Sequence, residues 1–60
     1  MVPPFDIFRQ EEDGKILWIG AAATLEDAER VVGHEMLSKQ SAYLIVSMKT
    51  GTKRLIEPER

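Results

Sequence analysis

The chain has 60 residues, of which 43% are hydrophobic and 30% charged, and eight basic against ten acidic side chains leave a formal net charge of −2. We expect one domain over residues 1–60 with a thin core, because so short a chain buries only about 60% of the surface that its unfolded form exposes. The near-neutral charge argues against binding nucleic acid mainly by neutralising phosphates. The lack of cysteine excludes disulfides and thiolate zinc sites, so self-association is the remaining way to add stability.

The N-terminal third predicts a β-hairpin. Two prolines precede a strand over about residues 5–10, and a second strand follows over about 15–20. Asp13-Gly14 lies between them, and this pair favours a tight turn because glycine accepts the positive φ that such turns need. The second strand is apolar on both faces from Ile16 to Ile19, so we place it in the middle of the sheet.

A helix is predicted over about residues 24–39. The Thr24 hydroxyl can accept a hydrogen bond from the backbone near Asp27, which is the spacing of an N-terminal capping box. Apolar residues then recur at helical spacing and form one stripe that can be buried. The stripe consists of Leu25, Ala28, Val31, Val32 and Met36.

The C-terminal third predicts a second hairpin. Residues 41–48 are rich in aromatic and β-branched residues, and a Thr50-Gly51 turn leads to a polar strand over about 52–57. The fold class is therefore α+β in the order ββαββ, with one helix packed on one face of a four-stranded sheet. Because the helix connects strands 15–20 and 41–48, we expect those two strands to be adjacent and parallel, in the strand order 1-2-3-4.

One helix covers only one face of such a sheet, yet the inner strands carry apolar side chains on both faces. With Leu44, Val46 and Met48 turned toward the helix, the alternation of the strand turns Tyr43 and Ile45 away from it. An uncovered apolar patch usually marks an interface. We therefore predict a homo-oligomer, most simply a dimer, formed through this face or through an edge strand. Its predicted contact residues are Trp18, Tyr43 and Ile45.

Two alternatives to the dimer remain open. In the first, the chain is a monomer in which Val2, Pro3, Pro4 and the C-terminal tail partly cover Trp18 and Tyr43. Small monomers do leave aromatic side chains half exposed. In the second, a different protein takes the place of the second copy.

The sequence offers no recognisable catalytic, metal or cofactor site. His34-Glu35 resembles the start of the zinc-protease helix motif, but the second ligand position is Ser38, whose hydroxyl is a poor zinc ligand. The acidic residues 11–13 lack the spaced ligands of a calcium loop. We expect a non-enzymatic protein that has no catalytic residue, no metal and no cofactor.

Lys49, Lys53 and Arg54 cluster around the second hairpin. A basic β-ribbon can enter a DNA groove or follow phosphates, so the alternative function is that of a nucleic-acid-binding accessory protein. The simpler interpretation is a charged edge that prevents sheet-to-sheet aggregation.

The opening gives no sign of export. It lacks the basic start and the long apolar run of a secretory signal, and no window approaches the roughly 18 apolar residues of a membrane span. We therefore expect a cytoplasmic protein with no membrane partner.

The first hairpin, the helix start Ala23–Glu29 and the segment Ala42–Gly51 together resemble small uncharacterised bacterial proteins of ββαββ form. The resemblance spans about residues 5–57. It implies this architecture and a bacterial origin, and it brings no catalytic residue.

Overall fold

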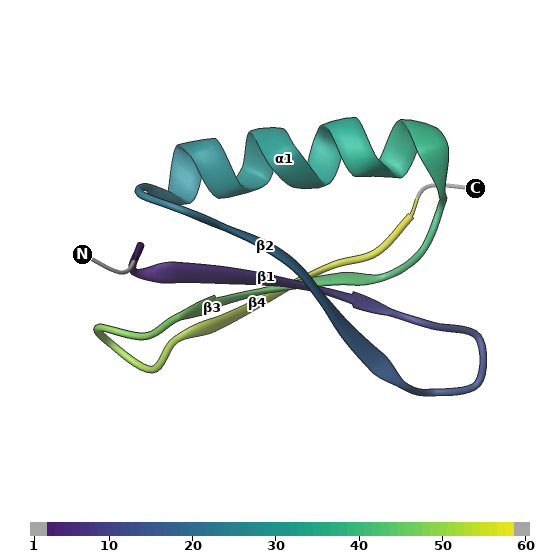
Figure 1. Cartoon of the computed structure of the whole chain (residues 1–60), viewed down its shortest axis with the longest axis horizontal. Coiled ribbons are helices and arrows are strands. Elements are labelled where there is room, and N and C mark those ends of the chain that lie inside the picture. Colours follow the sequence, from purple (N-terminus) through teal and green to yellow (C-terminus); the bar gives the residue numbers. More distant parts are fainter. Residues whose placement is uncertain (1–2, 59–60) are drawn as a thin grey trace.

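A computed structural model describes residues 3–58 and contains one helix lying along one face of a four-stranded sheet (Figure 1). The elements follow in the predicted order, which confirms an α+β fold with the helix packed on the sheet. Their bounds are β1 Phe5–Gln10, β2 Ile16–Ala22, α1 Leu25–Ser38, β3 Tyr43–Ser47 and β4 Lys53–Ile56.

The strands lie in the order β2-β1-β3-β4, and each neighbouring pair is antiparallel. The predicted order 1-2-3-4 and the predicted parallel pairing of the second and third strands are therefore wrong. β2 and β3 do run in the same direction, since each is antiparallel to β1, but β1 lies between them. A helical crossover sets the direction of the strand that follows it, and it does not require that strand to be the neighbour of the one before.

β1 lies in the centre of the sheet and carries apolar side chains on both faces. Phe5 and Ile7 share the helix side of the sheet, whereas Phe8 lies on the opposite side. β2 is an edge strand instead of a middle one, and Ile16 and Leu17 at its start stay 60% and 47% exposed. Apolar side chains on both faces therefore do not distinguish the central strand β1 from the edge strand β2, because both strands have them.

β2 also contains a bulge. Ile7 pairs with Gly20 and Phe8 pairs with Trp18, so Ile19 is the extra residue. A bulge changes which face the following residues occupy and increases the local twist. Here it lets Trp18 face away from the helix while Ile19 still packs against the core.

Both predicted turns place a glycine at positive φ. The angle is 88° at Gly14 and 75° at Gly51. The first turn is closed by the Glu11 N–H, which donates to the Lys15 carbonyl at 2.7 Å, and in the second the Gly51 N–H donates to the Ser47 carbonyl at 2.7 Å. Residues with a Cβ lose about 1–2 kcal/mol in this region, so the glycines specify the two hairpins.

The helix begins where the sequence predicts. Thr24 is its N-cap, and the Thr24 Oγ1 accepts a hydrogen bond from the Asp27 N–H at 3.1 Å. Ala28 and Val32 on the predicted stripe are buried, and Val31 and Met36 pack against the same core. Leu25 lies at the end of the stripe and keeps 36% exposure.

The core lies between α1 and the sheet, around Ile7, Tyr43 and Ile45, none of which is more than 1% exposed. The expectation that Tyr43 and Ile45 point away from the helix is therefore wrong. Ile45 pairs directly with Ile7, so the two side chains share a face. The Tyr43 hydroxyl donates to the Lys39 carbonyl at 2.8 Å, at the end of α1. Both faces of β3 are apolar, so alternation alone does not say which one meets the helix.

Candidate functional site

The sheet face opposite α1 carries one apolar side chain from each strand. The strand registers pair Phe8 with Trp18 and with Leu44, and they pair Leu44 with Leu55. Directly paired residues of antiparallel strands point to the same face, so these side chains form a continuous line across the sheet. We call Trp18, Phe8, Leu44 and Leu55 the apolar row, and the face that carries it the open face.

The open face remains accessible in residues 3–58, where α1 is the only helix and lies on the other side. Trp18 keeps 57% exposure and Leu55 56%, while Phe8 and Leu44 between them are half-buried. Ile16, which pairs with Gln10 on this face, adds an exposed side chain beside the row. The largest exposed aromatic residue of the domain is therefore part of an apolar surface rather than an isolated side chain.

Sequence reasoning located one of the four residues of the apolar row. Trp18 lies on the open face as expected, whereas Tyr43 and Ile45 lie beneath α1. Phe8 and Leu55 were missed, and Leu44 was wrongly expected to face the helix. The signal for Phe8 was present, because it interrupts the alternation of its strand and so indicates that both faces of the strand are apolar.

Two side chains of opposite charge, Asp6 and Lys53, lie in the cross-strand row next to the apolar row. The Asp6 carboxylate accepts a hydrogen bond from the Trp18 Nε1–H at 3.2 Å, which places it on the open face. Asp6 pairs with Val46, and Val46 pairs with Lys53 on β4. A negative group on β1 and a positive group on β4 therefore flank the same apolar surface.

The two edge strands differ in charge. β4 contains Lys53 and Arg54, and charged residues on an edge disfavour pairing with another strand. β2 has no charged residue between Ile16 and Ala22. β2 is therefore the less protected edge of the sheet.

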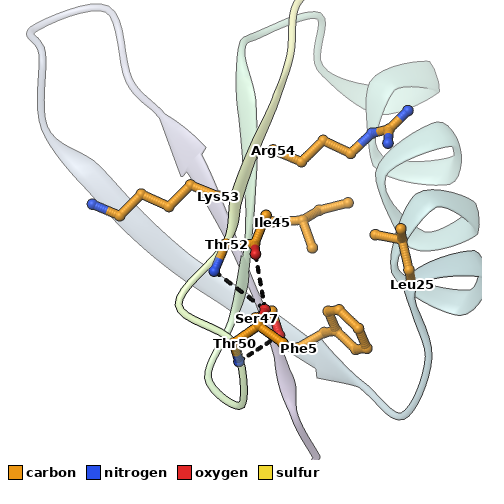
Figure 2. Close-up of a pocket in the computed structure, with 8 residues that line it drawn as sticks. All are labelled: Phe5, Leu25, Ile45, Ser47, Thr50, Thr52, Lys53 and Arg54. Atoms are coloured by element: carbon orange, nitrogen blue, oxygen red, sulfur yellow. Dashed lines mark hydrogen bonds between the residues drawn. The ribbon is translucent and has the colours of Figure 1, made fainter.

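The three basic residues of the second hairpin do not form one patch. Figure 2 shows Lys53 and Arg54 pointing to opposite sides of β4. Arg54 lies on the helix side, where its guanidinium pairs with the Glu29 carboxylate at 3.4 Å, and Lys49 lies in the exposed turn. The structure thus separates these cations instead of aligning them along one surface.

A hollow of about 380 Å³ lies on the helix side, between the start of α1 and the second hairpin (Figure 2). Phe5, Leu25 and Ile45 form its apolar part, and the hairpin contributes Ser47 and Thr50. The Ser47 Oγ accepts a hydrogen bond from the Thr50 N–H at 3.4 Å. The residues that line the hollow include no histidine or carboxylate that could take a proton from these hydroxyls.

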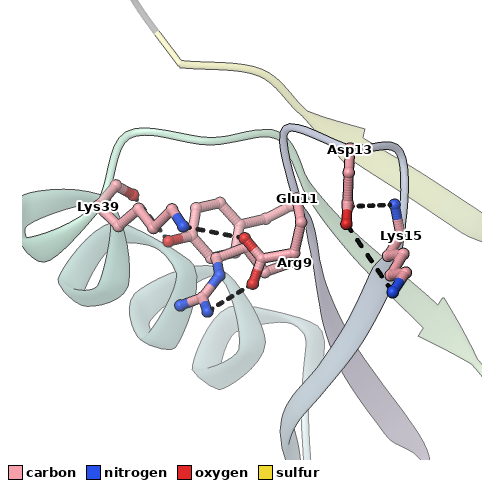
Figure 3. A network of polar contacts seen from close by, with 6 residues as sticks. Arg9, Glu11, Asp13, Lys15 and Lys39 are labelled. Carbon is pink, nitrogen blue, oxygen red and sulfur yellow. Dashed lines mark hydrogen bonds and ion pairs between the residues drawn. The ribbon is translucent and has the colours of Figure 1, made fainter.

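A polar network ties the first hairpin to the end of α1 (Figure 3). The two Glu11 carboxylate oxygens accept hydrogen bonds from Arg9 Nη2 and from Lys39 Nζ, each at 2.9 Å. The bond from Arg9, followed by that from Lys39, lowers the pKa of the Glu11 carboxyl, and Glu11 in turn raises the pKa of the Arg9 guanidinium. Because cations already hold both its oxygens, Glu11 supports the fold and is not available as a cation ligand.

No known protein family, curated protein or solved structure matches the chain. The resemblance to bacterial ββαββ proteins therefore stays a prediction. Among residues 3–58, no helix is long and apolar enough to cross a membrane. The same residues contain no cluster of three or more potential metal ligands from histidine, cysteine, aspartate and glutamate. The open face, with its apolar row and its two flanking charges, is the candidate functional site.

Proposed function

We propose that this chain is a small, non-enzymatic protein-interaction module that self-associates through its open face and needs no cofactor. The observation that carries the proposal is the apolar row, whose two outer residues, Trp18 and Leu55, are more than half exposed. Contiguous apolar surface on a small domain is typical of contact sites. A dimer is the simplest assembly, because one face can then pair with the same face of a second copy.

Trp18 supplies the largest single contribution to such an interface. Its exposed 57% corresponds to about 120 Å² of surface, and burial of this area stabilises a complex by about 3 kcal/mol. Two copies contribute about 6 kcal/mol, whereas association costs about 4–15 kcal/mol in lost freedom of motion. The rest of the apolar row must therefore be buried as well, and we expect micromolar rather than nanomolar affinity.

The monomer alternative has less support. Pro3 is itself exposed, Tyr43 is already covered by α1, and Trp18 is still 57% exposed in the presence of Pro4. Val2 and residues 59–60, which the alternative also invokes, lie outside the described residues. The exposure of Trp18 therefore favours self-association.

Sedimentation velocity tests the proposal. A concentration range from about 1 μM to about 1 mM covers association free energies of about −8 to −4 kcal/mol. We expect the parent chain to pass from monomer to dimer mass within this range. Trp18→Ser and Leu55→Ser should each move the transition to at least about tenfold higher concentration, because each removes a large side chain from the interface.

Leu37→Ser is the matched control, because Leu37 is 86% exposed but lies on α1, away from the open face. We expect this variant to associate like the parent chain. A parent chain that stays monomeric over the whole range would contradict the proposal. Equal losses in the Leu37 variant and the Trp18 variant would place the contact on another surface.

The alternative, a nucleic-acid-binding accessory protein that uses Lys49, Lys53 and Arg54, has weaker support. Arg54 is engaged with Glu29, and Lys53 faces the other side of the sheet. Binding through phosphates loses affinity steeply as salt rises. Salt-sensitive retention of the parent chain on a DNA column, abolished by Lys49→Glu and Lys53→Glu together, would favour this alternative.

A further inference from the structure

We propose that two copies pack with their open faces together about a two-fold axis parallel to the strands, so that Asp6 of each copy lies within reach of Lys53 of the other. This inference rests on the proposed function and adds the partner, a second copy of the chain, and the geometry. The starting observation is that one sheet face carries both an apolar row and two opposite charges.

The charges occupy defined places on the open face. Asp6, Val46 and Lys53 lie in one row across the sheet, and the apolar row is its neighbour. The two rows are two residues apart along the strands, about 7 Å. The hydrogen bond from Trp18 holds the Asp6 carboxylate on this face, and Figure 2 shows Lys53 pointing away from α1.

A two-fold axis parallel to the strands exchanges the two sides of the sheet. It places β2 of one copy on β4 of the other and β1 on β3. Positions along the strands do not change, so each row of one copy faces the same row of the other. Trp18 then packs against Leu55 of the other copy, and Phe8 packs against Leu44. Each aromatic side chain meets a smaller aliphatic one, so the face is complementary to itself.

The same operation pairs the charges. Asp6 on β1 and Lys53 on β4 lie on opposite sides of the axis, so each Asp6 comes to the same side as Lys53 of the other copy. The lateral offset is one strand, about 4.8 Å, and the faces are about 10 Å apart, a distance that the flexible lysine stem can span. The Trp18 N–H remains satisfied, because it already donates to Asp6.

Two other arrangements lack this complementarity. An axis that runs across the strands places Asp6 opposite Gln10 of the other copy, and a carboxylate buried without a cation is unfavourable. Pairing of the uncharged β2 edge with a second β2 extends the sheet sideways and keeps Asp6 and Lys53 of the two copies apart. The charge pattern therefore selects the axis parallel to the strands.

The size of the face predicts a reversible complex. Four strands about 4.8 Å apart and about five residues of about 3.3 Å each give a footprint of about 20 by 17 Å. Such an interface lies below the roughly 1,200 Å² of total buried surface at which stable complexes begin. Because the buried apolar area is small, the two Asp6–Lys53 pairs decide how the two copies are oriented relative to each other.

Charge exchange between copies tests the arrangement. Asp6→Lys and Lys53→Asp each create two like-charge contacts in a homodimer, so each variant alone should associate at least about tenfold more weakly than the parent chain. An equimolar mixture of the two variants restores both contacts, because one copy then carries two lysines and the other two aspartates. We expect the mixture to regain dimer mass in sedimentation velocity at low salt, where screening is weak.

Three controls keep the outcome interpretable. Lys49→Asp makes the same charge change in the exposed turn and should leave association unchanged. Asp6→Asn keeps a hydrogen-bond acceptor for Trp18 but removes the charge, so it separates the two roles of Asp6. Circular dichroism during thermal unfolding verifies that each variant is folded. If the parent chain dimerises but the mixture associates no better than the single variants, the arrangement is wrong and the proposed function stands. If the parent chain is monomeric over the whole concentration range, the arrangement and the proposed function are both wrong.

Discussion

Two adjacent residues of β3 test which face of the sheet meets the helix. Ile45 is 1% exposed beneath α1, whereas Leu44 lies on the open face and is half-buried. Truncation of each to alanine makes a comparable chemical change at neighbouring positions. We expect Ile45→Ala to destabilise the domain severely and Leu44→Ala to destabilise it little.

The magnitude follows from burial. Ile45→Ala removes about three methyl or methylene groups at about 0.8 kcal/mol each, and the residual cavity adds to this, for a total of about 2–4 kcal/mol. Ile45 borders the hollow beside α1, so its surroundings can relax and we expect the lower half of this range. A domain of this length has about 3–9 kcal/mol of stability. A loss of about 3 kcal/mol should lower the melting temperature by about 20 °C.

Urea titration monitored by circular dichroism measures both variants, at a concentration where sedimentation shows a monomer. Leu44→Ala should cost less than about 1.5 kcal/mol, because its side chain contacts solvent in the monomer. A loss in Leu44→Ala equal to or larger than that in Ile45→Ala would refute the register between β1 and β3. The same result would remove the basis for the apolar row.

Two further predictions concern glycine positions and acid stability. Gly33→Ala should raise the free energy of unfolding by about 1 kcal/mol, because alanine favours the helix and an added Cβ meets nothing within 4 Å. Gly51→Ala should lower the free energy of unfolding by about 1–2 kcal/mol, because φ is 75° there. Urea midpoints that shift in the same direction for both variants would contradict this prediction. The folded pKa of Glu11 lies below the ordinary value of about 4.3, so its carboxylate stabilises the fold above that pH, and this contribution is lost as the pH falls through the folded pKa. Glu11→Gln should therefore flatten the acid side of the stability profile, and an unchanged profile would show that the bonds from Arg9 and Lys39 do not contribute.

The candidate site was only partly visible in the sequence. Because one helix cannot cover both faces of the sheet, an open face and Trp18 on it could be predicted. The side of β3 that meets the helix could not, because Tyr43-Ile45 and Leu44-Val46 are equally apolar sets with the same spacing along the strand. The choice between them depends on a residue distant in the sequence, Ile7, which pairs with Ile45.

Local chemistry in the sequence determined the elements of this protein. Thr24 at the helix start, the apolar stripe of α1, and the two glycines with positive φ each act within a few residues, so the helix and both hairpins could be predicted from neighbouring residues. Only the tertiary structure decided that β1 enters between β2 and β3, and hence which side chains line up as the apolar row. The reason is physical: strand order and register depend on contacts between segments far apart in the chain, and more than one pairing satisfies the same alternation of apolar residues.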